Sequence, residues 1–493
     1  MQTLLLIAVP FFPVLCALLC AFLPVLKDNK ARKCFVMGSL IVSFGLAVLL
    51  CIQPDAEVTL FTITDSVPIV LMTDGLGRAF MLLMSGMWLL AGAYSFHYMD
   101  HEGAQGRYYT FYLLTLGMLM GLCEAGTLIT MYLFFEMMTL MSVALVLHSL
   151  SKEAVAAGIK YLLYSIAGAM MGLFGVFYLT GCSLTPAFLP GGNLDMTNPA
   201  VGGGTLLTVI FITVVGFATK AGMFPMHGWL PTAHPIAPAP ASAVLSGVIT
   251  KAGVLCIMRV LFYACGAEMI RDTWVQTALL ALCLTTVFMG SMMAFKTTEI
   301  KKRLAYSSVS QVSYVLFGVF MLSGVSFQGA MLHVYFHSIM KDLLFMCAGG
   351  IILKTGLRNV HDLRGIGRRM PVTMWCFTLA GVSLVGVPPL CGFYSKWQLC
   401  QGAIQSEMAL FSWLGPVVLL VSALLTAAYL LPVSIDAFFP GKDEKGEIHA
   451  GERCELPGGM LWPMIVLAVA LLLFGLFPSI LENAFQDIAM LIL

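Results

Sequence analysis

Long apolar stretches recur along the whole chain, and they limit its fold more than any other feature. A helix that crosses a membrane needs about 20 mostly apolar residues, and about fourteen stretches meet this condition. They lie at approximately 3–25, 34–52, 78–98, 108–123, 126–148, 158–180, 204–224, 239–264, 274–295, 304–323, 328–353, 371–402, 410–434 and 460–480. The apolar runs are continuous and lack the alternation of barrel strands. The sequence therefore predicts an all-α integral membrane protein with about fourteen transmembrane helices.

The composition agrees with a membrane protein and excludes several other classes. Of the 493 residues, 59% are hydrophobic and only 10% are charged, whereas about 25% are charged in a soluble domain. These values exclude a disordered chain, a coiled coil and a secreted disulfide scaffold. The net charge of +1 leaves no basic surplus for nucleic acid. The first apolar stretch lacks a positive leader and a cleavage site, so we expect a retained span and not a signal peptide.

Positive charges fall almost entirely in the loops that follow odd-numbered spans. Those loops hold Lys27, Lys30, Arg32, Lys33, Arg107, Lys152, Lys296, Lys301, Lys302, Arg303, Lys354, Arg358, Arg364, Arg368, Arg369, Lys442, Lys445 and Arg453. The loops on the other side hold only Arg78 and Arg271. Because positive loops stay in the cytoplasm, we expect a multi-pass protein of the cell membrane with both termini outside.

No motif for a metal or a cofactor is visible. The 14 cysteines are scattered singly and form no CxxC pair, whereas iron–sulfur clusters and structural zinc need grouped thiolates. A phosphate-binding glycine loop, HExxH and G-x-S-x-G are also missing. We therefore expect no cofactor, no metal and no redox centre in this chain.

Ionisable residues inside the predicted spans point to ion transport. Each costs about 2.5–3.5 kcal/mol at mid-membrane and therefore requires a reason. They are Glu136, Lys220, Lys251, the group His333, His337 and Lys341, and Lys396. A single such lysine often snorkels to the surface or forms a structural ion pair. Their occurrence in several spans favours a proton pathway over a purely structural explanation.

His333, His337 and Lys341 are spaced four residues apart, which places them along one face of one helix. Successive side chains would rise in steps of about 6 Å, as a proton relay needs. A zinc site is the alternative for the two histidines, but no third ligand motif accompanies them. A satisfied polar core is the other alternative. Asp342 would point about 100° away, so we expect a packing partner and not a relay member.

Lys220 and Lys396 lie in spans that are interrupted by glycine and proline. Broken helices are tolerated at membrane depth where they line a wet cavity, and matching breaks in two halves indicate repeated structure. The two lysines are 176 residues apart, which fits two five-helix repeats over spans 4–8 and 9–13, the second inverted. A nearby carboxylate changes how tightly a lysine holds its proton. A movable Glu136–Lys220 pair would therefore act as a proton switch.

Four segments together resemble a known family. They are residues 214–254, IKKRLAYSSVSQVSYVLFG (300–318), LHVYFHSIMKDLLFMCAGG (332–350) and GVPPLCGFYSKWQL (386–399). These segments are similar to the antiporter-like subunits of respiratory complex I, the D subunit of Mrp-type antiporters, and membrane subunits of energy-converting hydrogenases and formate hydrogenlyase. The resemblance covers roughly residues 75–435 and implies fourteen spans, two inverted five-helix repeats and broken helices 7 and 12.

The resemblance also implies residue roles. Glu136, Lys220, Lys251 and Lys396 match the polar axis of the family, His333, His337 and Lys341 match its helix-11 positions, and His234 matches a loop histidine. Glu124 departs from the pattern, so its role stays open. The chain ends shortly after the last span, so we expect the long lateral helix of the largest complex I subunit to be missing.

The implied domains are residues 1–104 with helices 1–3, 105–265 with the first repeat, 266–436 with the inverted repeat, and 437–493 with a cytoplasmic loop and helix 14.

Three functions compete at this point. The favoured one is translocation of protons, alone or together with Na⁺, in a redox-driven complex. Its partner chains would hold the iron–sulfur, hydrogenase-like or dehydrogenase centres. The second is a role as the D subunit of a secondary cation/proton antiporter of the Mrp type. The third is a membrane scaffold without transport, which the buried charges disfavour.

Overall fold

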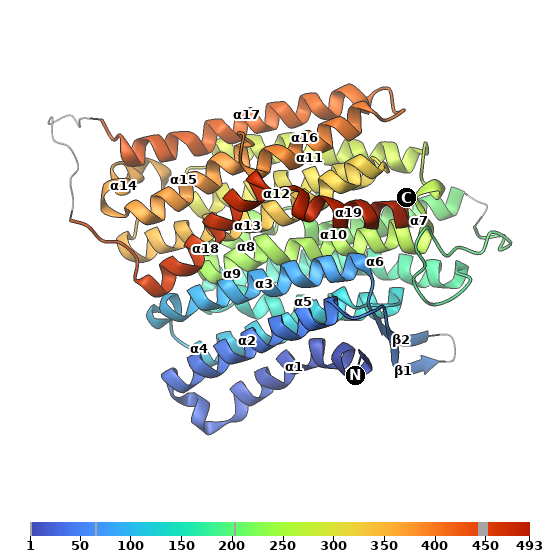
Figure 1. The fold of residues 1–493 in the computed structure, drawn as a ribbon, viewed down its shortest axis with the longest axis horizontal. Coiled ribbons are helices and arrows are strands. Elements are labelled where there is room, and N and C mark those ends of the chain that lie inside the picture. Colours follow the sequence, from blue (N-terminus) through green and yellow to red (C-terminus); the bar gives the residue numbers. More distant parts are fainter. Residues whose placement is uncertain (1, 65–66, 202–203, 442–451) are drawn as a thin grey trace.

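The structure is a computed structural model that describes residues 2–64, 67–201, 204–441 and 452–493. Most of these residues form long helices that lie side by side in one bundle (Figure 1). Both termini lie towards the same end of the bundle, on the right in Figure 1. The chain therefore crosses the bundle repeatedly and returns to the end at which it began.

The first part of the chain contains six helices and one hairpin. Its elements are α1 (Gln2–Phe22), α2 (Asn29–Cys51), β1 (Glu57–Thr64), β2 (Val67–Met72), α3 (Gly75–Tyr98), α4 (Gln105–Cys123), α5 (Leu128–Val146) and α6 (Lys152–Cys182). The antiparallel hairpin β1–β2 was not expected from an all-α fold. Its signal is a short run rich in Val, Thr and Ile, which favour strands, outside the apolar stretches.

The middle of the chain contains the first interrupted helix and a helix with two π-helical segments. Its elements are α7 (Gly204–Ala221), α8 (Leu230–Ile236), α9 (Ala239–Val244), η3 (Leu245–Ile249), α10 (Thr250–Met258), η4 (Arg259–Cys265), α11 (Trp274–Lys296), α12 (Ile300–Phe320) and α13 (Gly324–Thr355). The segments α9, η3, α10 and η4 continue one another and are buried along their length.

The last part of the chain contains the second interruption. Its elements are α14 (Ile366–Arg369), α15 (Pro371–Val385), α16 (Cys391–Ile404), α17 (Phe411–Phe438), α18 (Gly458–Leu476) and α19 (Ser479–Ile492). Short 3₁₀ turns lie between helices at Pro24–Lys27, Met99–His101, Ala267–Met269 and Val360–Leu363. Helix α19 was not expected. It presents an apolar face to α13 and includes buried Phe485 and Ile488.

The outer helices turn apolar side chains outward, as a membrane requires. On α6, residues spaced three or four apart are exposed, among them Leu163, Phe174 and Phe177 at 53–64%. The opposite face of α6 carries small residues, and Gly168 lies against Gly216 of α7. Small residues allow close approach of helices in a membrane. Eleven helices of the described residues are long and apolar enough to span a membrane, which supports a multi-pass membrane protein.

Both interruptions have local causes. Helix α7 ends at Ala221 and is followed by Gly222, whose φ of +82° favours glycine, and Pro225 follows shortly. Helix α15 is capped by Gly386 in the left-handed conformation, and the two prolines after it cannot continue a helix. The breaks place Lys220 at the end of α7 and Lys396 within the first turns of α16.

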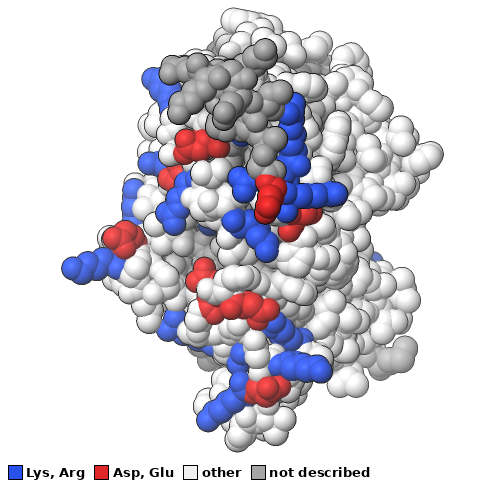
Figure 2. All heavy atoms as spheres, turned by 90° about the vertical axis from the view of Figure 1, so that its left-hand side faces the viewer, with Lys and Arg blue, Asp and Glu red and all other residues white. Residues whose placement is uncertain are grey.

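Lysine and arginine gather on the end face opposite the termini, interspersed with Asp and Glu (Figure 2). The turn after α1 and helix α14 lie at this end in Figure 1. Lys442 and Lys445, two of the basic residues counted in the sequence, lie outside the described residues. The basic loops of the described chain therefore share one face.

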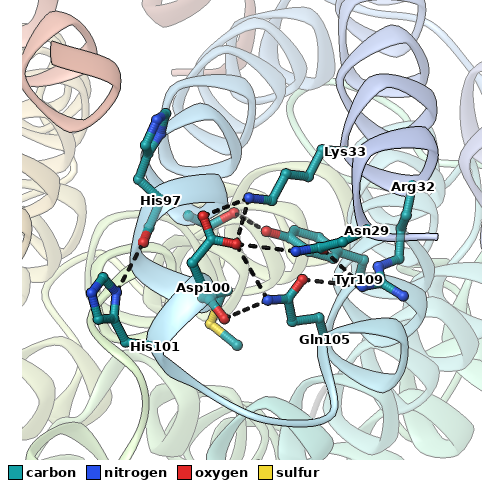
Figure 3. A network of polar contacts seen from close by, with 10 residues as sticks. Asn29, Arg32, Lys33, His97, Asp100, His101, Gln105 and Tyr109 are labelled. Carbon is teal, nitrogen blue, oxygen red and sulfur yellow. Dashed lines mark hydrogen bonds and ion pairs between the residues drawn. The ribbon is translucent and has the colours of Figure 1, made fainter. Parts of the chain in front are cut away.

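A polar network on this end ties α2, α3 and α4 together (Figure 3). Lys33 Nζ lies 2.5 and 2.6 Å from the two Asp100 carboxylate oxygens. Arg32 donates to Gln105 Oε1 at 3.1 Å, and Gln105 Nε2 donates to Met99 O at 2.7 Å. Burial raises the pKa of Asp100, but its bonds with Lys33 outweigh this and hold the pKa below its usual range.

Candidate functional site

Lys220 is buried between α6, α7 and the residues that follow the break. Its ammonium donates to Tyr161 Oη at 2.7 Å and to Ser165 Oγ at 3.2 Å. It also lies 4.3 Å from the centroid of the Tyr161 ring and 5.7 Å from that of Trp229. Hydroxyls and aromatic faces stabilise a cation without neutralising it. The site can therefore hold a proton on Lys220 or release it.

Glu136 lies on α5, and no ion pair within 4.0 Å joins it to Lys220 in the described chain. The glutamate is half-buried, and its Oε1 atom is buried without a hydrogen-bond partner among the described residues. The two groups interact electrostatically. Tyr161 links the elements, because its hydroxyl bonds Ser142 of α5 at 2.7 Å. The predicted pair is therefore separated in this structure, with a tyrosine beside the lysine.

Lys251 contacts the histidine row of α13. Its Nζ lies 2.8 Å from His337 Nδ1 and donates to Ser246 O at 2.7 Å. The His337 and His333 rings stack with centroids 5.8 Å apart. All three side chains are fully buried. The structure thus brings together residues that are 86 positions apart in sequence.

His333 continues this row toward α16. Its Nδ1 lies 2.9 Å from Ser395 Oγ, and its Nε2 lies 3.1 Å from Gln311 Oε1 of α12. Ser395 is the neighbour of Lys396 in sequence. Direct polar contacts and ring stacking therefore extend from Lys251 through both histidines to the residue beside Lys396.

Lys341 is the third member of the α13 face, and it turns to α12. It donates to Ser307 Oγ at 2.7 Å and to Leu304 O at 3.0 Å. Tyr429 of α17 donates to the same serine at 2.7 Å. Lys341 therefore forms a branch of hydroxyl groups beside the histidine row.

Lys396 reaches back across the second helix break. Its ammonium donates to Leu384 O at 2.6 Å and Val385 O at 3.1 Å, the last carbonyls of α15. The negative end of a helix dipole favours a cation. The ammonium also lies 5.2 Å from the centroid of the Tyr314 ring, which stacks on His333. The carbonyl groups at the helix break therefore fix the position of the Lys396 ammonium.

His234 does not join the row. It is fully buried, stacks on Phe345 at 4.8 Å, and neither ring nitrogen has a hydrogen-bond partner among the described residues. Glu124 is also fully buried, with both carboxylate oxygens unpartnered in the described chain.

Sequence reasoning missed the hydroxyl partners Tyr161, Ser165, Ser307, Ser395 and Tyr429. The serine-rich start of α12 was a visible signal.

Sequence reasoning also missed a buried ion pair in which Arg259 of η4 binds both carboxylate oxygens of Asp74 at 2.6 and 2.7 Å. Burial raises the Asp74 pKa, but Arg259 outweighs this and holds it below its usual range. The pair fixes the start of α3 against η4.

A cavity of about 800 Å³ opens beside α16 and α19. Its polar lining includes Gln328, Gln398, Gln401 and Glu482, and Gln398 donates to Glu482 Oε1 at 3.1 Å. No group of three His, Cys, Asp or Glu side chains that could hold a metal occurs among the residues that the structure describes.

Residues 125–426 match the family described as "NADH:quinone oxidoreductase/Mrp antiporter, TM". The chain belongs to this family of antiporter-like membrane subunits. The matched segment includes every candidate site residue predicted from the sequence except Glu124, whose role had been left open.

Two relatives show the two branches of the family. The chain is 33% identical over 434 residues to the N subunit of NADH-quinone oxidoreductase of Desulforudis audaxviator, with 84% of each chain covered. It is 30% identical over 415 residues to the D subunit of the Na(+)/H(+) antiporter of Bacillus subtilis, with 83% of this chain and 80% of the relative covered. The predicted family is confirmed. Its members similar to this chain include both a subunit of a quinone oxidoreductase and a subunit of a cation antiporter.

Solved structures share the fold. A chain of the membrane-bound sulfane sulfur reductase, an archaeal respiratory membrane complex, superposes with a TM-score of 0.86 at 21% identity, covering 100% of this chain and 98% of that one. A chain of respiratory complex I from Thermus thermophilus gives 0.82 at 22% identity, covering 99% of each. Both neighbours are parts of multi-subunit membrane complexes.

Proposed function

We propose that this chain is the proton-translocating subunit of a redox-driven membrane complex of the complex I and energy-converting hydrogenase type. The observation that carries the proposal is the buried row from Lys251 through His337 and His333 to Ser395, next to Lys396. Buried ionisable groups inside a membrane are costly, and their alignment in one row is typical of a proton relay. Electron carriers would belong to partner subunits.

The proposed membrane topology has fourteen spans. Helices α4 and α12 are long but more polar than the eleven candidates, and we count both, together with α15 and α16 as one broken span. Spans 4–8 (105–265) and 9–13 (266–436) form the two inverted repeats, after helices 1–3 (1–104) and before the last segment (437–493). The basic face of Figure 2 would be cytoplasmic by the positive-inside rule, with both termini outside.

Each residue has a proposed role in this pathway. Glu136 controls how readily Lys220 binds a proton in the first half. Lys251 passes protons to the histidines of α13, with Lys341 as a side branch, and His234 remains a proposed auxiliary group. Lys396 releases protons to the outside, where the cavity beside α16 opens.

A secondary cation/proton antiporter is the rival function, favoured by the relatives that are named as D subunits of Na(+)/H(+) antiporters. The two functions share the pathway and differ in the energy source. In one, a redox partner drives proton movement. In the other, an imposed sodium gradient is sufficient.

The experiment is to purify the chain with its partners through an affinity tag, identify them by mass spectrometry, and reconstitute the complex in vesicles. Proton movement that requires a reductant accepted by a copurified redox partner supports the proposal. Proton movement driven by a sodium gradient without any reductant supports the antiporter. Absence of proton movement under both conditions, with an intact complex, contradicts both.

A further inference from the structure

Asp342 is a buried carboxylate that the pathway described above does not use. It lies on α13 directly after Lys341 and is fully buried. Neither carboxylate oxygen has a hydrogen-bond partner among the described residues. An isolated buried charge of this kind is costly unless it is paired or protonated. The expectation of a plain packing partner does not account for this cost.

The carboxyl group occupies a space made for it between α13 and η3. A β-carbon on Gly247 of η3 would overlap Asp342 Oδ1, and the Ser338 carbonyl of α13 borders the same position. The missing side chain of Gly247 therefore leaves room for the carboxyl. Segment η3 is π-helical, and single π-helical turns occur frequently at functional sites.

Lys251 follows Gly247 by four residues, so both face the same side of their helix. That side is the one against which Asp342 packs. Lys251 is also the charged side chain with which the Asp342 carboxyl interacts electrostatically. Tyr112 of α4 lies near as well, but its hydroxyl donates to Trp88 O at 2.7 Å. Lys251 thus contacts His337 and interacts electrostatically with Asp342.

No other Asp or Glu lies within α9–α13, α15 or α16 outside the short turns between helices, and the structure describes all of these residues. The first half of the molecule has Glu136 beside Lys220. Asp342 of the second half is the carboxyl group that can balance Lys251, which lies in the last span of the first half. Lys220 and Lys251 would then each have one carboxyl group nearby.

We propose that Asp342 is a proton-carrying residue of the second half, which exchanges a proton with Lys251 across η3. This inference rests on the proposed function. In the step, the carboxyl O–H bond breaks, a new N–H bond forms on the neutral Lys251 amine, and the electron pair remains on the carboxylate. The flexible lysine side chain then turns to His337 Nδ1 and delivers a proton there. No oxidant or reductant takes part.

The test uses the complete complex in vesicles and compares Asp342→Asn with Ser338→Ala. Asparagine keeps the volume of the aspartate but cannot carry a proton. Ser338 lies one turn away on the same face, and its hydroxyl only donates to Val334 O. We expect about a hundredfold loss of proton transport for Asp342→Asn, near wild-type transport for Ser338→Ala, and partial recovery for Asp342→Glu.

Wild-type transport by Asp342→Asn would overturn the inference. If Lys251→Ala in the same assay abolishes transport, the proposed function survives that result. If Lys251→Ala also transports normally, the proposed function fails with it.

Infrared difference spectroscopy supplies a second readout if Asp342→Asn does not assemble. A carboxyl C=O band that changes during turnover and shifts in Asp342→Glu supports proton exchange at this residue. A carboxyl spectrum that Asp342→Glu leaves unchanged contradicts it.

Discussion

At the first helix break, the Thr219 carbonyl accepts a hydrogen bond from the Trp229 indole at 2.8 Å. At the second break, the Leu384 and Val385 carbonyls accept from the Lys396 ammonium. Carbonyls at a helix break need donors at membrane depth. In the first half the neutral indole joins the Gly222 N–H, which donates to Thr219 O at 3.2 Å. In the second half a charged ammonium is the donor. Lys220 therefore does not donate to the carbonyls at the break. It contacts hydroxyl groups and aromatic rings instead.

The two halves also differ in how their buried ionisable side chains are connected to one another. In the first half, Lys220 donates to the hydroxyls of Tyr161 and Ser165, and Glu136 forms no ion pair with it in the described chain. Between the halves, several buried groups contact one another in series, from Lys251 of the first half to Ser395 of the second. The first break therefore places one buried lysine among hydroxyls, whereas the row from Lys251 to Ser395 joins several ionisable groups across the two halves.

The sharpest test of this comparison is Lys220→Ala, for which we expect the largest effect. Removing this buried lysine, the proposed partner of Glu136, should lower proton transport about a hundredfold or more. The measurement is proton uptake by vesicles at matched amounts of assembled complex. Lys152→Ala, at the exposed start of α6, is the control and should transport normally. Wild-type uptake by Lys220→Ala would show that this lysine is structural.

Glu136→Ala should reproduce the loss, because the switch needs both groups.

In the second half, Lys396→Ala should cost less, about tenfold in rate or ~1.4 kcal/mol. The double change His333→Ala/His337→Ala should impair the same step, and combining it with Lys396→Ala should add little, since members of one pathway are non-additive. Lys396→Glu should be milder than Lys396→Ala, because glutamate can still carry a proton.

Lys396→Gln separates transport from hydrogen bonding at the break. Glutamine can donate to the α15 carbonyls but cannot carry the proton, so this variant should assemble normally and transport about as slowly as Lys396→Ala. Losses that multiply when Lys396→Ala and the double histidine change are combined would show that the two sites belong to independent paths.

A smaller and paired prediction concerns Tyr161 and Tyr314, one in each half. Tyr161→Phe removes the hydroxyl that holds Lys220, a bond to a charged group worth about 1.5–3 kcal/mol, and should slow transport. Tyr314 donates to Leu419 O at 2.7 Å, so Tyr314→Phe keeps the ring near Lys396 and should lower only the stability, by ~1 kcal/mol. Transport rates and thermal unfolding in detergent check both. Equal transport rates for Tyr161→Phe and Tyr314→Phe would contradict the proposed difference between the two tyrosines.

The smallest effect is expected outside both halves, for the Lys33–Asp100 pair of Figure 3. Because Asp100 has a lowered pKa in the folded protein, its contribution to stability is present at neutral pH and is lost as pH falls through that pKa. Asp100→Asn should lower stability by less than about 1 kcal/mol at neutral pH and by less in acid. Thermal unfolding at several pH values tests this, and a change in transport would contradict it.

Much of the helical arrangement could be predicted from the sequence, because each span must satisfy its own backbone in lipid and so leaves a long apolar run. The hairpin β1–β2 and helix α19 could not be predicted in this way, since they lie outside such runs. Glycine and proline marked both helix breaks. The side chain that donates to the carbonyls at each break is determined by tertiary packing. Nothing in the sequence around Trp229 indicates that its indole fills this role.

The sequence by itself determined the membrane class, the family, and the spacing of His333, His337 and Lys341 on one helix, because these depend on composition and on helical periodicity. Only the tertiary structure decided which groups meet. The contact of Lys251 with His337, the tyrosine beside Lys220 and the unpaired carboxyl of Asp342 all lie between helices. Their distances depend on how the helices pack and where they break, and no local pattern along the chain encodes that geometry.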